Sequence, residues 1–332
     1  MSGAQAVLET AWYRGDWWLW LLRPIEFLFR LLSATRRAAY KHGLLKAWRA
    51  PVPVVVVGNI TVGGTGKTPV VIALVEHLQQ AGLRPGVVSR GYGASSTQFP
   101  HTVNSASTAA DCGDEPLLIH LRTGCPCVVS PDRPAAVRQL LAEFPVDVVL
   151  SDDGLQHYRL YRDVEIAVLD ASRGIGNGFC LPAGPLREPV ARLAQVHHVL
   201  KRGSDDLSDG VRYRAQALVN VVSNEQKALD ASEGPAVVSA VAGIGQPAQF
   251  FGTLLAAGYV VQENVFADHH AYTADDFSDL QDAFVIMTEK DAVKCRRLVG
   301  DNTWYLKIEA ELPRAVIEAV TLLAQTQQQE TP

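Results

Sequence analysis

The stretch VVVVGNITVGGTGKTP, residues 54–69, holds the residue types of a phosphate-binding loop, although its spacing departs from the usual one. The common pattern is G-x-x-x-x-G-K-[ST]. Gly66, Lys67 and Thr68 fit the end of this pattern, whereas Thr61 stands where the first glycine is expected. The departure alters how the chain enters the loop, but it leaves the residues that would contact phosphate in place.

The flanks of this loop favour a nucleotide site over the alternative, a glycine-rich turn without a ligand. The valine-rich run 53–57 predicts a buried parallel strand, and apolar residues at helical spacing predict a helix over 68–80. The loop glycines would let backbone N–H groups turn toward a phosphate at the start of that helix. Lys67 would then reach the β- and γ-phosphates, and Thr68 would bind Mg²⁺.

Two adjacent acids, Asp152 and Asp153, end the strand-like stretch VDVVLSDDG at residues 146–154. An aspartate at a strand end beside a phosphate loop binds Mg²⁺ directly or through water in many nucleotide-hydrolysing and nucleotide-using enzymes. Two neighbouring carboxylates repel each other unless a cation neutralises them. The sequence therefore predicts a metal site here, and it leaves open which aspartate contacts the ion.

Two further stretches carry polar side chains at the ends of predicted elements. SRGYG (89–93) follows a probable strand, so Arg90 and Tyr92 would face the edge of the sheet where ligands bind in open α/β folds. GDEP (113–116) opens a helix. Its two carboxylates either complement the helix dipole or act as a base and a metal ligand.

Two loops complete the set of candidates. FADHHAYT (266–273) places His269 and His270 side by side, where they could bind a metal, act as a base or lie idle in solvent. GNGFCLPAGPLREP (176–189) is rich in glycine and proline and ends in Arg187-Glu188. A loop of this length without a periodic pattern is usually functional or disordered.

The elements that must position these residues alternate along the chain. Strands are predicted at 53–57, 86–89, 126–130, 146–151 and 164–169, and then at 236–241, 259–265, 284–288 and 304–308. Helices lie between most of them, with the later ones predicted at 247–257, 274–282, 291–298 and 313–325. Alternation of this kind predicts a P-loop NTPase-like, doubly wound parallel sheet, followed by a second, smaller α/β domain.

The N-terminal residues differ from the rest of the chain. Residues 16–32, DWWLWLLRPIEFLFRLL, are rich in Trp, Leu and Phe, with charges at helical spacing on one side, and a basic stretch follows. An apolar face with tryptophan at its edge and a basic flank is typical of an amphipathic helix in a membrane interface. The alternative is a helix that packs on the protein's own core. The longest uncharged run is too short to span a bilayer.

These observations divide the chain into four parts. They are an N-terminal membrane-interface helical segment (1–48), a P-loop core (49–190), a linking segment (191–235) and a C-terminal α/β domain (236–325). The linking segment has weak periodicity, and its stretch YRAQALVNVV could form a strand.

Composition narrows the class of protein. The chain has 332 residues, a net charge of −5 and 20% charged residues, which is ordinary for a globular protein and argues against a nucleic-acid partner. Its five cysteines are odd in number and lack paired C-x-x-C motifs, so a reducing cytosolic compartment suits them better than a secreted disulfide framework.

Together, NITVGGTGKTP, SRGYG, GDEP, SDDGLQH, LPAGPLREP, FADHH and MTEKDAVK, in this order, resemble the bacterial lipid A 4′-kinases over nearly the whole chain. Threonine in place of the first loop glycine is itself a feature of that family. The resemblance implies transfer of the ATP γ-phosphate, with Mg²⁺, to the 4′-hydroxyl of an acylated glucosamine disaccharide 1-phosphate in lipid A biosynthesis. It also implies a peripheral location at the cytoplasmic face of the bacterial inner membrane.

The resemblance implies a role for each site residue. The residues implied in holding ATP are Thr61, Val62, Gly63, Gly64, Thr65, Gly66, Lys67 and Thr68. Asp114 would be the catalytic base, paired with His269, and Lys67 would act on the phosphates. Those implied for Mg²⁺ are Thr68, Glu115, Asp152 and Asp153, and those implied near the lipid head group or the transferring phosphate are Arg90, Tyr92 and Arg187. His270 receives no role.

The rival class is a membrane-associated switch ATPase of the MinD/ParA type. The loop of that class begins with a signature lysine, whereas Val62 stands at that position here. A GTPase metal chaperone is a third option, but it would require clustered Cys and His, and the guanine-reading motif N-K-x-D is missing.

Overall fold

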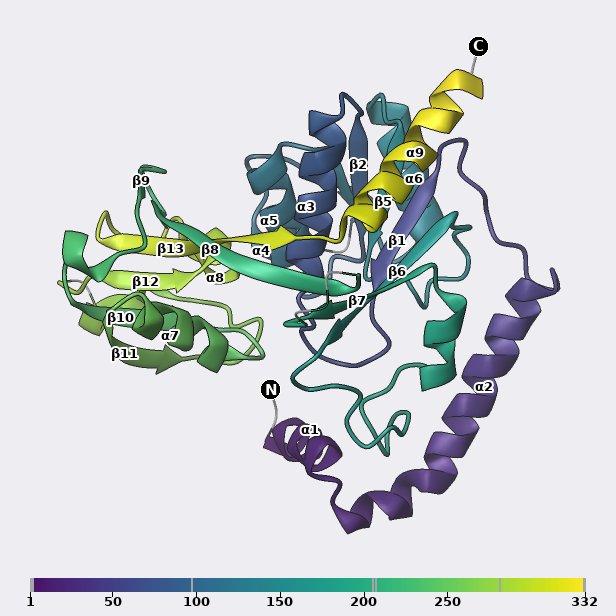
Figure 1. The fold of residues 1–332 in the computed structure, drawn as a ribbon, viewed down its shortest axis with the longest axis horizontal. Helices are drawn as coiled ribbons and strands as arrows, with labels where there is room; N and C mark the ends of the chain where they lie inside the picture. Colours follow the sequence, from purple (N-terminus) through teal and green to yellow (C-terminus); the bar gives the residue numbers. More distant parts are fainter. Residues whose placement is uncertain (1–2, 97, 205, 207, 281, 331–332) are drawn as a thin grey trace.

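The computed structural model describes residues 3–96, 98–204, 206, 208–280 and 282–330. One thirteen-stranded sheet crosses this part of the chain in the order β11-β10-β12-β13-β8-β7-β6-β1-β5-β2-β4-β3, and β9 pairs with β8 (Figure 1). The strands are β1 (Val54–Gly58), β2 (Pro85–Ser89), β3 (His101–Val103), β4 (Cys127–Val129), β5 (Val148–Asp152), β6 (Val164–Asp170), β7 (His198–Arg202), β8 (Gly210–Asn220), β9 (Gln226–Lys227), β10 (Val237–Ala242), β11 (Val260–Val265), β12 (Val285–Thr288) and β13 (Thr303–Glu311).

Helices pack on this sheet, and among the described residues three helices come before its first strand in the chain. The α-helices are α1 (Gly3–Arg14), α2 (Arg23–Lys41), α3 (Lys67–Gln80), α4 (Ala109–Cys112), α5 (Asp114–Thr123), α6 (Arg133–Glu143), α7 (Pro247–Ala256), α8 (Glu289–Cys295) and α9 (Arg314–Glu330). The 3₁₀ helices are η1 (Trp17–Leu22), η2 (Val190–Gln195), η3 (Ala231–Glu233) and η4 (Ala274–Leu280).

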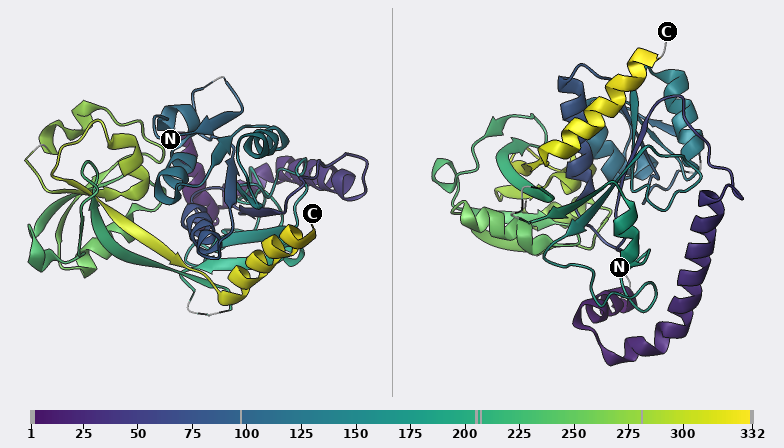
Figure 2. Two further views of the ribbon diagram at one scale, coloured as in Figure 1. Left: turned by 90° about the horizontal axis from the view of Figure 1, so that it is seen from above. Right: turned by 45° about the vertical axis from the view of Figure 1, so that its right-hand side comes forward.

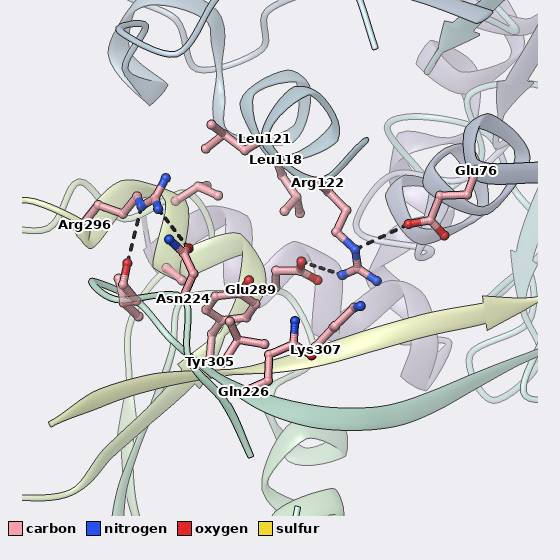
Figure 3. Close-up of a pocket in the computed structure, with 14 residues that line it drawn as sticks. Glu76, Leu118, Leu121, Arg122, Asn224, Gln226, Glu289, Arg296, Tyr305 and Lys307 are labelled. Atoms are coloured by element: carbon pink, nitrogen blue, oxygen red, sulfur yellow. Dashed lines mark hydrogen bonds and ion pairs between the residues drawn. The ribbon is translucent and has the colours of Figure 1, made fainter. Parts of the chain in front are cut away.

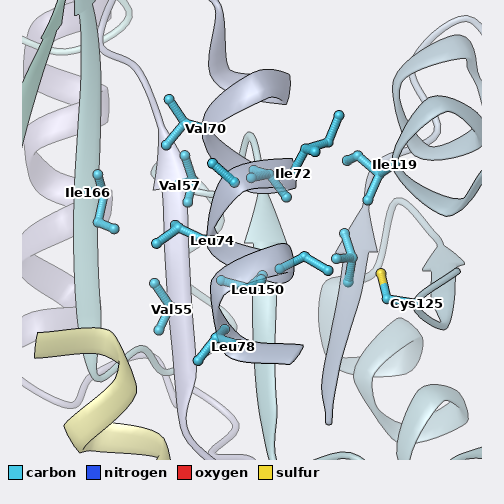
Figure 4. Close-up of a cluster of buried hydrophobic side chains, with 14 of the residues drawn as sticks. Val55, Val57, Val70, Ile72, Leu74, Leu78, Ile119, Cys125, Leu150 and Ile166 are labelled. Carbon is cyan, nitrogen blue, oxygen red and sulfur yellow. The ribbon is translucent and has the colours of Figure 1, made fainter. Parts of the chain in front are cut away.

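The first lobe, made of β1–β7 with α3–α6, is doubly wound as predicted. Successive side chains of a strand point to opposite faces of a sheet, so β1 divides its valines between two cores. Val55 and Val57 pack with α3 and α5 on one face (Figure 4), while Val54 and Val56 pack with α6 on the other. Because β1 is buried on both faces, its sequence is an uninterrupted apolar run, as in other parallel strands.

The second lobe, made of β10–β13 with α7 and α8, is joined to the first by a shared sheet. The strand β8 makes this link. Its first residues pair in parallel with β7, and the rest of the strand pairs antiparallel with β13. The predicted strand in YRAQALVNVV is therefore confirmed, whereas β7 was not predicted. The four-part division at residues 48, 190 and 235 stays a prediction from the sequence. The final helix α9 packs Val316, Val320 and Ala324 into the core that contains α3.

The N-terminal segment is a chain of three helices that runs beside the first lobe (Figures 1 and 2). The sequence predicted one amphipathic helix, and the structure divides it: Trp17–Leu22 is a 3₁₀ helix, and α2 starts at Arg23. Pro24 explains this start, because proline lacks the N–H that an earlier turn would need and fits the first turn of a helix. Within the described residues, no helix has the length and apolar character needed to cross a membrane.

The predicted helix at 274–282 is a 3₁₀ segment, η4, which ends at Leu280. A side chain near its start binds the preceding backbone, because Asp276 accepts hydrogen bonds from the N–H and hydroxyl of Thr273. Short polar side chains that bind nearby backbone compete in this way with regular α-helix.

Candidate active site

The phosphate loop lies between β1 and α3, at the carboxyl edge of the parallel strands. Gly63 and Gly66 have φ angles of 99° and 82°, which only glycine adopts without strain. Thr61, the residue in place of the usual glycine, is buried and forms a β-bridge with Leu186. The N–H of Val62 donates to the carbonyl of Pro185 at 2.8 Å. The 176–189 loop thus braces the entry of the phosphate loop.

Lys67 begins α3 and is part of a charged chain that reaches the 176–189 loop. Its Nζ lies 3.5 Å from Oδ1 of Asp153. Arg187 contacts both carboxylate oxygens of Asp153, with Nη1 at 3.1 and 3.0 Å. These two cations outweigh burial and hold the pKa of Asp153 well below its usual range. Asp153 has a φ of 47°, an unusual backbone conformation of the kind that is often found at functional sites.

Its neighbour Asp152 has a different environment. The side chain is fully buried, and Oδ2 accepts a hydrogen bond from the hydroxyl of Ser89 at 3.3 Å. Its Oδ1 is buried without a hydrogen-bond partner among the described residues. Burial, with a contribution from nearby Glu115, raises the pKa of Asp152 to about 7. A buried carboxylate with one free oxygen is a group that a cation would stabilise.

Asp114 and His269 meet from opposite lobes. Asp114 is buried at the start of α5 and His269 lies in the loop after β11, yet His269 Nδ1 is 2.9 Å from Asp114 Oδ2. Burial would raise the pKa of Asp114, but the hydrogen bond from His269 and the charge of Lys290 outweigh it and lower the pKa. The same hydrogen bond raises the pKa of His269. The structure therefore joins two residues that the sequence placed 155 positions apart.

Lys290 is a charged residue of this site that sequence reasoning left without a role. Its Nζ lies 3.3 Å from Glu115 Oε1, 3.3 Å from Asp268 Oδ1, 3.5 Å from His269 Nε2 and 3.7 Å from Asp114 Oδ2. It stands in the stretch MTEKDAVK, which is one of the motifs of the family resemblance. The available signal was a lysine two residues after a strand, which is too common to identify a site by itself.

Two cavities meet at Glu115. A nucleotide-side cavity of about 330 Å³ is lined by the phosphate loop from Gly64 to Thr68 and by residues of both lobes. A second cavity of about 660 Å³, which we call the acceptor cavity, is lined by residues of α2 and of the first lobe. Glu115 lines both cavities. A reacting group in one cavity would therefore lie next to a group held in the other.

The acceptor cavity contains the three residues predicted near the head group, Arg90, Tyr92 and Arg187. The ring of Tyr92 also lies edge-on to His269, with centroids 5.2 Å apart. The cavity holds further residues that the sequence did not suggest, namely Phe29, Ser33 and Arg36 of α2 and the buried Arg133. Phe29, Ser33 and Arg36 were missed because their placement depends on how α2 docks on the first lobe. Arg133 was missed because it starts α6 and is held in the interior by hydrogen bonds to the carbonyls of Ser130 and Asp152.

The nucleotide-side cavity also contains residues that were not predicted. Arg202 of β7, Tyr213 of β8 and Gln246 at the start of α7 line it. Tyr213 donates a hydrogen bond to the carbonyl of Gly66, and burial raises the pKa of its hydroxyl. Apolar side chains of both lobes, including Ile72, form another wall of the cavity. Such a lining suits the flat apolar faces of a nucleobase.

The second histidine, His270, lies outside these cavities. Its Nε2 is 3.2 Å from Asp276 Oδ2, and its ring packs against Phe266 and Tyr272. These contacts give His270 a local structural role in shaping its loop.

The predicted metal residues gather around the phosphate loop without forming a closed cage. Across the described ranges, no three or more His, Cys, Asp or Glu side chains come together as a metal site. Mg²⁺ in phosphoryl-transfer sites does not require one, because it usually keeps several waters and is bound by one or two carboxylates together with substrate phosphates.

Comparison with known proteins points in one direction. A family model described as tetraacyldisaccharide-1-P 4′-kinase matches residues 18–325. The chain is 52% identical over 313 residues to a tetraacyldisaccharide 4′-kinase of Ectopseudomonas mendocina, covering 93% of this chain and 94% of the relative. A relative with the same description from Aeromonas salmonicida is 48% identical over 317 residues, with 95% of each chain covered.

A solved structure gives the same result at a lower level of identity. The fold is similar to the crystal structure of LpxK from Aquifex aeolicus in complex with ATP, with a TM-score of 0.78 and 28% sequence identity. The match covers 93% of this chain and 99% of that one. The alternative of a MinD/ParA-like switch ATPase is not supported by any of these similarities.

Proposed function

The chain belongs to the tetraacyldisaccharide-1-P 4′-kinase family, the kinases of lipid A biosynthesis, and on this premise we propose how its own residues perform the transfer. The observation that carries the proposal is the contact between Asp114 and His269, made from opposite lobes beside the point where two cavities meet at Glu115. ATP occupies the nucleotide-side cavity, and the sugar of the acylated disaccharide enters the acceptor cavity.

The phosphates of ATP lie on the loop from Thr61 to Thr68. Backbone N–H groups at the start of α3 point toward them, and the ammonium group of Lys67 neutralises the charge that builds up during transfer. Asp153 holds Lys67 and Arg187 near each other, since it contacts both. Arg187 also lines the acceptor cavity, so it is placed between the donor and the acceptor.

Mg²⁺ fits the donor set beside this loop. The hydroxyl of Thr68 and the carboxylates of Glu115, Asp152 and Asp153 are all oxygen donors, which Mg²⁺ prefers. Asp152 has a buried Oδ1 without a partner among the described residues, whereas Asp153 is already held by two cations, so Asp152 is the better ligand. When bound, the ion would supply charge neutralisation at the β- and γ-phosphates.

The Asp114–His269 pair accepts the proton of the 4′-hydroxyl. As the sugar oxygen forms its bond to the γ-phosphorus, the bond from that phosphorus to the bridging oxygen of ADP breaks, and the hydroxyl proton passes to the pair. The lowered pKa of Asp114 keeps its carboxylate ionised before the reaction. Arg90 and Tyr92, in the same cavity as Arg187, orient the sugar or its phosphate.

The N-terminal helices place the protein on the membrane that holds its lipid substrate. In α2 the charged side faces the protein: Glu26 is buried, accepts a hydrogen bond from the N–H of Cys180 at 3.2 Å and pairs with Arg23 and Arg30. The outer side of α2 is apolar and exposes Ile25, Phe27, Leu28, Leu31 and Leu32, and the preceding η1 exposes Trp17, Trp20 and Leu21. A helix with this arrangement suits the interface of a bilayer, here the cytoplasmic face of the inner membrane.

One assay tests the proposal directly. Phosphate transfer from γ-labelled ATP to the disaccharide lipid is measured in detergent micelles, with and without Mg²⁺, for the wild-type chain and for Asp114→Asn. We expect transfer that requires Mg²⁺ and the lipid and that falls sharply in the variant. ATP hydrolysis without lipid at the same rate, or a fully active Asp114→Asn, would contradict the assigned roles.

A further inference from the structure

Lys290 stands on a rigid part of the second lobe. It follows Glu289 in the first turn of α8, whose N-cap Thr288 accepts a hydrogen bond from the N–H of Asp291. The carboxylate of Asp291 is fully buried, accepts a hydrogen bond from Gly243 N–H at 2.9 Å and pairs with Lys294 at 2.8 Å. The start of α8 is therefore fixed to the second lobe before Lys290 reaches across to the first.

The same turn of α8 is also tied to α5, the helix that begins with Asp114 and Glu115. Figure 3 shows Arg122 of α5 pointing toward Glu289 and Glu76, with Arg122 Nη1 2.6 Å from Glu289 Oε1. Two consecutive residues of α8 thus hold α5 with opposite charges, Glu289 near its end and Lys290 at its start. This arrangement fixes the distance between the two lobes at the transfer site.

The ammonium group of Lys290 has three carboxylates around it, which come from both lobes. Asp114 and Glu115 belong to the first lobe and Asp268 to the second, at distances of 3.7, 3.3 and 3.3 Å from Nζ. Carboxylates gathered this closely repel one another without a cation. Lys290 supplies that cation from within the chain.

In the hydrogen bond between Lys290 and His269, only Lys290 can be the donor. An ammonium group can donate hydrogen bonds but cannot accept them. Lys290 Nζ lies 3.5 Å from His269 Nε2, and a hydrogen bond between them forms only when this ring nitrogen presents its lone pair. The hydrogen of the neutral imidazole is then on Nδ1, which faces Asp114 Oδ2 at 2.9 Å. This tautomer satisfies both Asp114 and Lys290, whereas the opposite tautomer would satisfy neither and would leave its N–H only the more distant Asp268 Oδ1, at 3.9 Å.

We propose that Lys290 is a positioning residue of the transfer site, which selects the His269 tautomer with hydrogen on Nδ1 and joins the carboxylates of the two lobes. The inference rests on the proposed role of the Asp114–His269 pair. It assigns to Lys290 no contact with the transferred phosphate, which distinguishes it from Lys67, the cation of the phosphate loop.

The test compares Lys290→Met, Lys290→Gln and Lys290→Arg with the wild-type chain. Histidine is labelled with ¹⁵N, the His269 signals are assigned with His269→Asn, and the spectrum reports which ring nitrogen carries hydrogen. In parallel, kcat and KM for ATP are measured with the lipid acceptor. Lys307→Met is the matched control, because Lys307 is another lysine of the second lobe near the lobe junction, where it forms an ion pair with Glu309 at 3.5 Å.

We expect the wild-type spectrum to show hydrogen on Nδ1 and Lys290→Met to shift His269 toward the other tautomer. In Lys290→Met, kcat should fall roughly 100-fold, as for loss of acid–base assistance, while KM for ATP changes less than about threefold. Lys290→Arg, which keeps the charge and the donors, should recover kcat to within about tenfold of wild type. Lys307→Met should leave both readouts unchanged.

Three results would overturn the proposal. An unchanged His269 spectrum in Lys290→Met would show that Lys290 does not select the tautomer. A large rise in KM for ATP with unchanged kcat would make Lys290 a phosphate ligand. If Lys290→Met does not fold, Lys290→Gln decides, since its amide donates without charge: a wild-type kcat in that variant would exclude a need for the cation. The spectrum does not depend on turnover, so failure of the Asp114–His269 roles in the transfer assay is seen separately.

Discussion

The two ends of the transfer site are assembled in different ways. At the nucleotide end, the phosphate loop itself is one continuous stretch, residues 59–66, between β1 and α3 of the first lobe, while both lobes line the rest of the cavity. The acceptor end combines α2, the loop after β2, the start of α5 and the 176–189 loop, and its proton acceptor requires the second lobe as well. The phosphate loop therefore depends on one lobe folding, whereas the acceptor end depends on how separate parts dock.

The first prediction concerns the locally built end and has the largest expected effect. Lys67→Ala should lower kcat on the order of 1,000-fold, because the charge that builds up on the transferring phosphate loses its fixed cation. The thermal unfolding transition should stay cooperative and close to that of wild type. Lys201→Ala, which removes an exposed partner of Asp209, is the control and should retain full activity. A Lys67→Ala chain with near-normal turnover would mean that ATP binds elsewhere.

The second prediction concerns the end built across the lobes. Asp114→Asn and His269→Asn should each lower kcat about 100-fold with little change in KM for ATP, since the pair acts on the acceptor hydroxyl. Asparagine is chosen at 269 because the backbone there has a φ of 60°, which asparagine tolerates.

A double-mutant cycle on kcat sharpens this comparison. The double variant should be scarcely worse than the worse single variant, because residues that act as one unit are not additive. His270→Asn is the matched control, since this neighbouring histidine contacts Asp276 and aromatic rings outside both cavities. Two small effects that add strictly would exclude a functional pair.

The third prediction concerns the N-terminal helices, which we propose to bind the membrane beside the acceptor end. Trp17 and Phe27 are 76% and 67% exposed on the apolar side of the N-terminal helices. Replacing both with serine should weaken binding to anionic vesicles by roughly tenfold or more, because burial of each side chain contributes about 1.5–3 kcal/mol. Leu322→Ser on α9, where the leucine is 65% exposed, is the control. Equal flotation of both variants and wild type would show that this surface does not bind lipid.

The fourth prediction has the smallest effect and concerns a link between the lobes. Asp170 at the end of β6 accepts a hydrogen bond from Gln246 of the second lobe at 2.7 Å and pairs with Arg202. Burial would raise its pKa, but the hydrogen bonds from Ser172 and Gln246, with Arg202, lower the pKa to about 2. Asp170→Asn should reduce the free energy of unfolding at pH 7 by about 1–2 kcal/mol.

The pH dependence of this difference follows from its sign. The pKa of an aspartate in the unfolded chain is about 3.9, so the folded state stabilises the ionised form. The stabilisation by Asp170 is thus fully present above about pH 4 and decreases as the pH falls toward 2. Chemical denaturation at pH 7, 4 and 3 measures it. Asp209→Asn, at the ion pair with the exposed Lys201, is the control and should change the free energy of unfolding less than Asp170→Asn does.

The sequence by itself determined the parts whose signals are local. The phosphate loop was predicted because its glycines, lysine and threonine lie within a few positions between a strand and a helix, and Asp152-Asp153 because they end a strand. The doubly wound sheet of the first lobe followed from apolar runs that alternate with helical patterns, since strands buried on both faces must be apolar throughout. The partnership of Asp114 and His269 came from the family resemblance, because 155 residues separate them and no spacing rule relates them.

Only the tertiary structure decided how these parts meet. The strand β7 is short and partly exposed, so its sequence lacked the pattern that would have revealed one sheet shared by both lobes. The orientation of α2 could not be predicted either. Glu26 on its charged side accepts a hydrogen bond from the backbone N–H of Cys180 and pairs with Arg23, and the apolar side is therefore left facing outward. Lys290 acquires its role in the same way: a lysine after a strand is unremarkable in sequence, and three carboxylates and one imidazole nitrogen surround it only once the lobes are docked.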